Sequence, residues 1–246
     1  MKKYRDKYGL YLIEGDNLIA EAISCNVEIT AVFLREDYRY AEGITVPEPY
    51  VLSKKLFSNI TQTETSQGAI AIVKKRNYTE GEFFSLCEAG NILVLDRLQD
   101  PGNIGAMIRT ADAAGYKGVI AIRGTSDIFS PKAARAAAGS LFRMPVLFKD
   151  TAADALAVIK SRHKRIVSTC FDANTDYFHA DLKSDIALLI GNEGGGLSGE
   201  LIKAADIKVK IPMRREVDSL NAAVAAGILM YESKRQAEPS LKYEKG

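Results

Sequence analysis

The feature that most constrains the fold is a regular alternation of short apolar runs and helix-like segments that begins at Asn91. Short continuous apolar runs are typical of strands that are covered on both faces. The expected strands are residues 92–95, 119–122, 146–148, 166–170, 186–190 and 207–211. The expected helices are residues 103–114, 131–138, 152–160, 199–205 and 219–234. This order predicts an α/β fold with a mainly parallel sheet and helices on both faces.

The first part of the chain repeats the alternation on a smaller scale and predicts a separate small α/β domain. Its expected strands are residues 10–13, 29–34 and 68–73, and its expected helices are residues 15–25 and 53–60, with Pro47 and Pro49 in a loop. The polar stretch that follows resembles a linker with a short helix around Phe83 and Phe84. We therefore predict domains at 1–76 and 91–246, joined by a linker at 77–90.

Composition excludes several classes of protein. A chain of 246 residues that is 47% hydrophobic and 26% charged is typical of globular proteins. The longest apolar stretch, 222–230, is too short to cross a bilayer, and the charged residues 1–8 are unlike a secretory signal peptide. Three distant cysteines and two histidines predict neither a disulfide framework nor a metal site, so we expect a protein of the reducing cytoplasm. The net charge of +2 does not by itself indicate a nucleic-acid partner.

Three unusual loops are expected at carboxyl ends of strands, where open parallel sheets bind their ligands. In the first, Pro101 and Gly102 suit a type II turn and Asn103 can cap the next helix, on which Arg109 lies off the apolar stripe. The second has four glycines in the six positions 191–196, which leave backbone groups open to a ligand, and it includes Glu193 as a candidate polar group.

The third loop follows the last expected strand and leads into the last helix. Pro212 ends the pairing of the strand, and Asp218 or Ser219 can cap the helix. The helix and the residues before it carry an apolar stripe with small residues, consistent with close packing against a partner: Leu220, Ala223, Val224, Gly227, Ile228 and Tyr231.

A dinucleotide site is one alternative. Residues 194–199 match G-x-G-x-x-G, and Glu216 and Asp218 lie at about the distance of the acidic residue in an NAD site. However, residues 191–193 separate the strand from these glycines, where the fingerprint should begin almost at once. An NAD-linked oxidoreductase is therefore disfavoured.

Together the three loops resemble the motifs of the SpoU/TrmH group of SPOUT-type RNA 2′-O-methyltransferases. The family pattern D-P-x-N-x-G-x-x-x-R-T-A is matched by residues 100–111, the N-E-G pattern by residues 192–194, and the I-P-M and S-L-N patterns by residues 211–213 and 219–221. Residues 8–73 are similar to the L30e-type substrate-binding domain found in one branch of the family, so the resemblance covers nearly the whole chain.

The resemblance implies a trefoil knot at the C-terminus, S-adenosylmethionine bound in a bent shape within it, and a homodimer formed through the knotted region. The cofactor-binding residues that it implies are Thr169, Gly191, Asn192, Ile211, Met213 and Leu220. The catalytic set that it implies is Arg109, Asn103, Glu193, Ser219 and Asn221. It places Arg109 at the target ribose, where it would help to activate the 2′-hydroxyl. Because a guanidinium is a poor base, Arg109 would orient the ribose and stabilise charge unless a nearby phosphate altered its proton balance.

The L30e-type domain favours 23S ribosomal RNA as the substrate, since that domain resembles ribosomal RNA-binding proteins. A tRNA 2′-O-methyltransferase and a non-catalytic RNA-binding protein of the same fold are the alternatives, and the intact catalytic set argues against the second. The enzyme interpretation depends on a spatial prediction: residues 192–193, Met213 and Arg109 should converge around one crevice.

Overall fold

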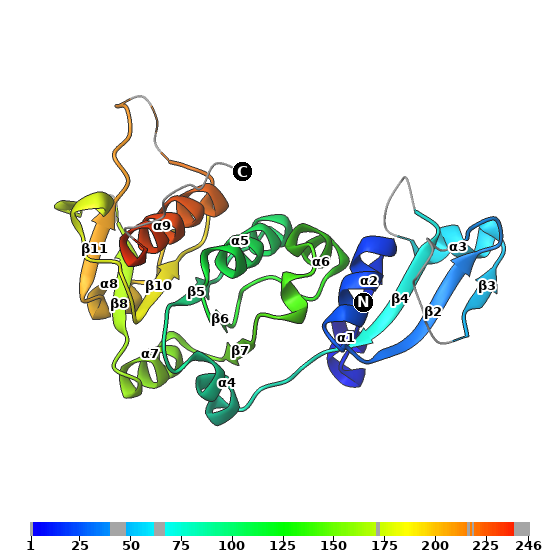
Figure 1. The fold of residues 1–246 in the computed structure, drawn as a ribbon. Coiled ribbons are helices and arrows are strands. Elements are labelled where there is room, and N and C mark those ends of the chain that lie inside the picture. The colour runs from blue at the N-terminus through cyan, green and yellow to red at the C-terminus, as the bar shows by residue number, and fades with distance from the viewer. Residues whose placement is uncertain are drawn as a thin grey trace.

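Two β-sheets, each with its own helices, organise the chain (Figure 1). The computed structural model describes residues 2–39, 48–61, 67–170, 173–215, 217 and 219–238. The expected loop residue Pro47, the expected cap Asp218 and the acidic residue Glu216 lie outside the described residues.

The N-terminal sheet has four strands in the order β1-β4-β2-β3 within the described residues. Its central pairs are antiparallel, and β3 joins the edge in parallel with β2. Its elements are α1 (Lys2–Tyr8), β1 (Leu10–Glu14), α2 (Asp16–Ser24), β2 (Ile29–Arg35), β3 (Tyr50–Leu52), α3 (Lys54–Ile60) and β4 (Ala69–Lys74). The three predicted strands and two predicted helices are confirmed. The prediction missed α1 and β3, because α1 buries no residue and β3 is a three-residue edge strand.

The C-terminal sheet contains seven described strands, all paired in parallel, in the order β7-β6-β5-β10-β8-β11-β9. Its strands are β5 (Ile92–Asp96), β6 (Gly118–Ile122), β7 (Val146–Lys149), β8 (Arg165–Thr169), β9 (Thr175–Asp176), β10 (Ile186–Ile190) and β11 (Ile207–Lys210). The predicted parallel sheet is confirmed. Because every pair is parallel, the carboxyl ends of these strands share one edge.

Helices cover both faces of this sheet, as Figure 1 shows with α5 and α9 above the strands and α4 and α7 below them. The helical elements are α4 (Glu80–Cys87), α5 (Pro101–Ala114), α6 (Pro131–Ala137), η1 (Ser140–Phe142), α7 (Ala152–Ser161), η2 (Tyr177–His179), α8 (Gly199–Ala204) and α9 (Ala222–Ala237). Each face of the sheet has its own apolar cluster, and successive residues of β5 point to opposite faces. Leu93 belongs to the cluster between the sheet and α5, and Val94 belongs to the cluster between the sheet and helices α4 and α7. Within the described residues, no helix combines the length and the apolar character that crossing a membrane would require.

The expected linker 77–90 contains α4, and this helix is part of the second domain's core. Phe83, Phe84 and Cys87 are buried with Ile92 and Val94 on one face of the sheet. A capping box starts α4, in which Thr79 and Glu82 satisfy each other's backbone N–H groups. The predicted short helix is confirmed, and it packs on the sheet instead of only connecting the domains.

Two helix starts differ from the sequence prediction. The helix α5 begins at Pro101 with Asp100 as its N-cap, since the Asp100 carboxylate accepts the Gly102 N–H at 2.8 Å. The expected turn at Pro101 and Gly102 with an Asn103 cap is therefore wrong: Pro is favoured at the first helical position, so the helix starts there and the residue before it, Asp100, becomes the cap. The helix α9 begins at Ala222 with Asn221 as its N-cap, so the expected cap at Ser219 is also wrong.

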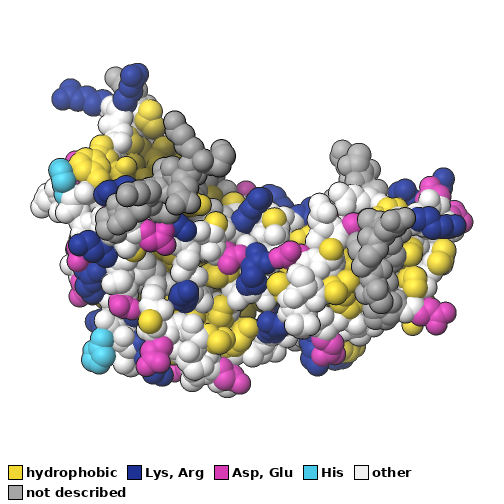
Figure 2. Space-filling view, viewed as in Figure 1, with side chains coloured by type: hydrophobic (Ala, Val, Ile, Leu, Met, Phe, Trp, Pro, Cys, Tyr) yellow, Lys and Arg dark blue, Asp and Glu magenta, His cyan; other side chains and the backbone are white. Residues whose placement is uncertain are grey.

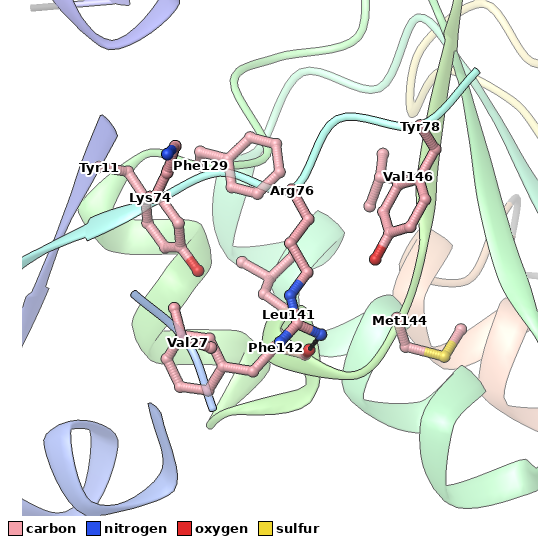
Figure 3. A pocket seen from close by; sticks show the side chains of 10 residues that line it. All are labelled: Tyr11, Val27, Lys74, Arg76, Tyr78, Phe129, Leu141, Phe142, Met144 and Val146. Carbon is pink, nitrogen blue, oxygen red and sulfur yellow. Dashed lines mark hydrogen bonds between the residues drawn. The ribbon is translucent and has the colours of Figure 1, made fainter. Parts of the chain in front are cut away.

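The two domains share one apolar cluster. The Tyr11 ring of β1 lies 5.0 Å from the Phe129 ring, and both belong to the cluster that also contains Leu93 under α5. A small pocket of about 10 Å³ at this junction is lined from both domains, and Arg76 crosses it to donate hydrogen bonds to the carbonyls of Cys25 and Phe142 (Figure 3). A pocket of this size holds about one water molecule, so the two domains are closely packed at this point of the junction.

Charged side chains seal the outer rim of the junction. Arg143 binds Asp112 of α5 at 2.7 Å and also pairs with Glu21 of α2. Figure 2 shows basic and acidic side chains beside one another in the middle of the molecule, where the two domains meet. Exposed ion pairs of this kind contribute little to stability, so the shared apolar cluster is the main source of the stability of the contact between the domains.

Candidate active site

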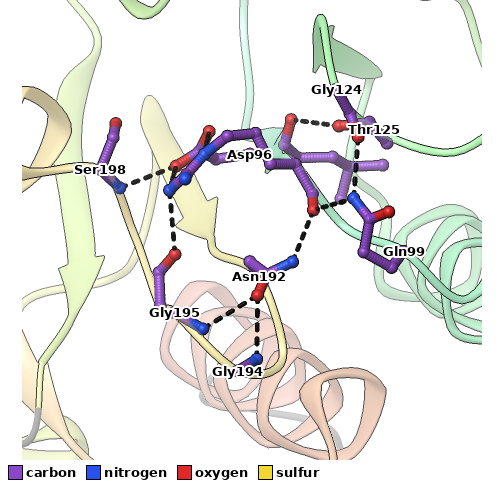
Figure 4. Close-up of polar contacts among 11 residues, drawn as sticks. Asp96, Gln99, Gly124, Thr125, Asn192, Gly194, Gly195 and Ser198 are labelled. Atoms are coloured by element: carbon purple, nitrogen blue, oxygen red, sulfur yellow. Dashed lines mark hydrogen bonds and ion pairs between the residues drawn. The ribbon is translucent and has the colours of Figure 1, made fainter.

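The glycine-rich loop after β10 closes on itself in a tight turn. The backbones of Asn192 and Gly196 exchange two hydrogen bonds, of 3.1 and 2.9 Å, and the Asn192 side-chain oxygen accepts the N–H groups of Gly194 and Gly195 (Figure 4). Gly196 has a φ of +63°, and a Cβ at Gly191 would lie 2.3 Å from Leu197 N. The glycines therefore permit a turn that side chains would prevent, and they leave its outer side open.

A buried carboxylate holds this turn to the loop after β5. Asp96 is 1% exposed, and it accepts hydrogen bonds from Arg97 Nε at 2.9 Å and from the Ser198 N–H at 2.8 Å. The Asn192 amide donates to the Arg97 carbonyl at 2.9 Å. Sequence reasoning assigned no role to Asp96 or Arg97. The available signal was an acidic residue directly after four buried apolar residues, because a buried carboxylate needs partners.

Glu193 joins the same turn to the start of α5. Its carboxylate accepts the N–H groups of Gln99 at 3.1 Å and Asp100 at 3.4 Å and the side-chain amide of Asn103 at 3.2 Å. Burial raises the pKa of the Glu193 carboxyl, but hydrogen bonds from its own backbone N–H, from Gln99 and from Asn103 outweigh burial and hold that pKa below its ordinary value. Glu193 is therefore an anion at neutral pH, placed where a helix N-terminus favours negative charge.

Asn103 extends this network to the third loop. Its side-chain oxygen accepts a hydrogen bond of 3.0 Å from the Asn221 amide. The Asn221 oxygen in turn accepts the N–H groups of Ala223 and Val224 as the cap of α9. The structure thus brings Glu193, Asn103 and Asn221 into one hydrogen-bonded chain that joins three loops distant in the sequence.

Two residues of the expected catalytic set stand apart from this chain. Arg109 is exposed on α5, six residues beyond Asn103 or about 9 Å along the helix axis. Ser219 is exposed in the segment before α9. Within the part of the chain that the structure describes, neither side chain makes a hydrogen bond or ion pair. Among the described residues no hydrogen bond or ion pair joins Arg109 or Met213 to Glu193, so their common crevice stays a prediction.

The expected cofactor residues gather at the ends of three neighbouring strands. Thr169 ends β8 and pairs with Val209 of β11, while Gly191 follows β10 on the other side of β8. Ile211 follows β11 directly and, like Met213, is half-buried, whereas Leu220 is exposed just before the cap of α9. This edge therefore offers apolar side chains beside an open glycine backbone, which suits a ligand with a flat ring and a hydrogen-bonding rim. Among the described residues, no group of His, Cys, Asp or Glu is arranged to hold a metal ion.

Two family models match the chain. The model of the SpoU rRNA Methylase family matches residues 90–231, and that of the MRM3-like substrate binding domain matches residues 1–71. Among similar proteins, the 23S rRNA (guanosine(2553)-2′-O)-methyltransferase RlmP of Bacillus subtilis is 34% identical over 94% of this chain and 90% of its own. The 23S rRNA (guanosine-2′-O-)-methyltransferase RlmB of Shewanella oneidensis is 29% identical over 96% of this chain and 99% of its own.

Solved structures of similar proteins superpose on nearly the whole of this chain. The SpoU methyltransferase AviRb from Streptomyces viridochromogenes, in complex with the cofactor AdoMet, superposes with a TM-score of 0.87 at 27% identity over 96% of this chain and 93% of that chain. The AdoMet-bound rRNA methyltransferase from Sinorhizobium meliloti gives a TM-score of 0.82 at 31% identity over 96% and 90%.

Proposed function

The chain belongs to the SpoU rRNA methylase family, and on that premise we propose that it transfers a methyl group from S-adenosylmethionine to a ribose 2′-hydroxyl of 23S ribosomal RNA. The observation that carries the proposal is the chain of hydrogen bonds from Glu193 through Asn103 to Asn221, because it joins the three family motifs at one edge of the sheet. A ribosomal RNA substrate would place the reaction in the cytoplasm.

The residues at the ends of β8, β10 and β11 fit S-adenosylmethionine. Ile211 and Leu220 supply apolar surface for an adenine ring, and the backbone around Gly191 and Met213 can read its edge. Thr169 and Asn192 complete the proposed cofactor set, Asn192 by fixing the glycine turn. When bound, the cofactor supplies an electrophilic methyl group, so the protein's main task is to position the hydroxyl and to manage its proton.

We assign Arg109 to the target ribose, supported by its exposure on α5 and its freedom from other partners in the described chain. A protonated guanidinium there can orient the ribose and stabilise the negative charge that develops on the 2′-oxygen. Glu193, Asn103 and Asn221 act as positioning residues, since they fix the starts of α5 and α9. Ser219, two residues before Asn221 in the sequence, is proposed as the fourth member of this group.

Two features support a trefoil knot and a homodimer. Residues 211–215 lead away from the body of the domain after β11, and residues 219–221 lead into α9 (Figure 1). The helix α9 is held between α5 and residues 180–182, because Lys234 donates to the Ala113 carbonyl and Ser233 donates to the Leu182 carbonyl. For the homodimer, Leu220, Val224 and Tyr231 leave an exposed apolar stripe at the start of α9 and along it. Figure 2 shows hydrophobic side chains at this end of the molecule.

The N-terminal domain favours ribosomal RNA over tRNA as the substrate. We propose that residues 1–76 form an L30e-like RNA-binding domain, supported by the match of residues 1–71 to a substrate-binding model, and that 77–90 lead into the methyltransferase domain at 91–246. The A. aeolicus TrmH/SpoU tRNA modifying enzyme covers only 67% of this chain, with a TM-score of 0.55, whereas the rRNA methyltransferase structure from Sinorhizobium meliloti covers 96%.

The test combines cofactor binding with mapping of the product. Calorimetric titration is expected to show binding of S-adenosylmethionine and none of NAD. Mapping of 2′-O-methylated riboses in total RNA, from cells with and without this protein, should then reveal a protein-dependent position in 23S rRNA. A position in tRNA would redirect the assignment to tRNA, and binding of NAD instead of S-adenosylmethionine would refute the methyltransferase.

A further inference from the structure

A cleft of about 430 Å³ lies between the N-terminal domain and the carboxyl ends of β6 and β7. Residues of α1 and the connection around Lys75 line one side, and residues 121–129 and 148–150 line the other. Its volume is within the range of ligand sites, and none of the proposed catalytic or cofactor residues lines it. The cleft is therefore a second concave surface, separate from the methyl-transfer site.

Both walls of the cleft are held in place. Arg5 of α1 donates from Nε to the Asp127 carboxylate at 2.8 Å, which ties the N-terminal helix to the loop after β6. Lys75 donates to the Asp6 carboxylate at 2.9 Å and lies 4.9 Å from the centre of the Phe129 ring. These contacts fix the width of the cleft, so a ligand meets a preformed surface.

One wall carries an exposed aromatic ring. Phe148 is 56% exposed near the end of β7, and its ring centre lies 6.3 Å from that of buried Phe129. An exposed ring supported from behind is a stacking platform, because every nucleobase has a flat face that can lie on it. Burial of Phe148 by a base would also remove apolar surface from water.

The lining of the cleft has one more basic than acidic side chain, with Lys2, Lys75, Arg123 and Lys149 against Asp6, Asp127 and Asp150. The carboxylates of Asp6 and Asp127 are already paired with Lys75 and Arg5. Lys2 makes no ion pair among the described residues. The contact of Arg123 with Asp150, at 3.8 Å between side chains that are 80% and 82% exposed, is a weak surface pair. Cations on both walls are therefore available to a phosphate backbone.

Hydrogen bonds connect the cleft to the loop that follows β5, which leads into α5 and Arg109. Gln99 donates to the Gly124 carbonyl at 2.9 Å, as Figure 4 shows, and the Ser126 N–H donates to the Leu98 carbonyl at 2.8 Å. In the sheet, β6 and β7 lie two to four strands away from β10 and β8, so the cleft lies about 10 to 20 Å from the ends of the strands that carry the proposed cofactor residues. A strand of RNA can span that distance within a few nucleotides.

We propose that this cleft binds single-stranded RNA next to the methylated nucleotide, with a base stacked on Phe148 and the neighbouring phosphates held by Lys2 and Arg123. The proposal rests on the proposed function for the identity of the RNA. It adds a subsite that positions the substrate, and none of its three residues takes part in methyl transfer.

The test measures binding of a short labelled oligoadenylate to the full chain by fluorescence anisotropy. Phe148→Ala is expected to weaken binding about tenfold or more, whereas Phe148→Tyr, which keeps the stacking face, retains it. Lys2→Gln and Arg123→Gln should each weaken binding and lower the salt dependence by about one phosphate contact. Matched controls away from the cleft are Phe178→Ala, which removes a ring that is 44% exposed, and Lys160→Gln; both should bind as the unaltered protein does.

Two further probes separate stacking from charge and single strands from duplexes. An abasic strand of the same length should bind weakly and without dependence on Phe148. Equal losses for Phe148→Ala and Phe178→Ala, or duplex RNA that binds with the same dependence on Phe148, would overturn the proposal.

Methyl-transfer kinetics distinguish this proposal from the proposed function. Phe148→Ala should keep its affinity for S-adenosylmethionine and its kcat and raise the KM for 23S rRNA. If the unaltered protein bound oligoadenylate through Phe148 but did not bind S-adenosylmethionine, RNA binding in the cleft would be supported and the proposed methyltransferase function would be refuted. If it methylated 23S rRNA while Phe148→Ala left both the KM and the oligoadenylate affinity unchanged, the cleft would be excluded.

Discussion

At the scale of single residues, the site depends on side chains that both donate and accept hydrogen bonds. Asn103 donates to Glu193 through its side-chain nitrogen and accepts from Asn221 through its side-chain oxygen, so both of its polar atoms are used. Asn192 likewise donates to the Arg97 carbonyl and accepts from two glycine N–H groups. The asparagines of the motifs therefore determine how the three loops meet.

Arg109→Ala is expected to keep the fold and the affinity for S-adenosylmethionine and to abolish methyl transfer, because the guanidinium is exposed and makes no hydrogen bond or ion pair within the described chain. Thermal denaturation and calorimetric titration control for folding and cofactor binding, and transfer of labelled methyl groups to 23S rRNA measures activity. Transfer near the normal rate would remove Arg109 from the mechanism.

Glu193 should make stability depend on pH in the acid range. Its pKa is lowered in the folded protein, so its contribution to stability is complete above its ordinary pKa of 4.5 and is lost as the pH falls through the lower folded value. Glu193→Gln should therefore flatten the fall in Tm below about pH 4.5. Parallel Tm profiles of the two proteins through this range would contradict the assignment of Glu193 as a stabilising anion.

At the scale of elements, the strands were predictable because both faces of the sheet are covered, which turns each strand into a short unbroken apolar run. The starts of α5 and α9 were not, since several polar residues compete for each cap and only three-dimensional geometry selects Asp100 and Asn221. That the three loops lie close together could be predicted, because their motifs resemble those of one family and the carboxyl ends of parallel strands share one edge of the sheet. Asp96 was missed although it directly follows four apolar residues, because its partners, Arg97 and the Ser198 N–H, are brought to it only by the fold.

The packing of α5 on α6 leaves no space for a side chain at Gly105. A Cβ at Gly105 would lie 2.3 Å from the Ala133 carbonyl oxygen and 2.6 Å from the Ala136 Cβ. Gly105→Ala should therefore lower the free energy of unfolding by about 1–3 kcal/mol, as overpacking does. The matched control is Gly81→Ala in α4, where a Cβ meets nothing within 4 Å and helix propensity predicts a gain of about 0.5–1 kcal/mol. Chemical denaturation measures both, and equal stability of the two variants would disprove the close contact.

At the scale of the whole molecule, α9 presents an apolar stripe that the described part of the chain leaves uncovered. Val224 on this stripe is 52% exposed. If the stripe is the homodimer interface, Val224→Asp should convert the protein from dimer to monomer, since a carboxylate buried at an interface is strongly disfavoured. Light scattering after size-exclusion chromatography measures the change. Leu86→Asp, at a residue 56% exposed on α4, is the control that should leave the dimer intact. If the Val224→Asp variant remained a dimer, the apolar stripe of α9 would be excluded as the homodimer interface.

The cluster that runs from Tyr11 through Phe129 to Leu93 has a consequence for how RNA is chosen. Two lobes that bury their apolar side chains in common cannot swing apart without breaking those contacts, so the angle between them is set before any RNA arrives. Adaptation must then come from the nucleic acid, which has to bend to touch both lobes at once. We therefore expect pliable RNA to be modified faster than the same sequence locked in a stiff helix.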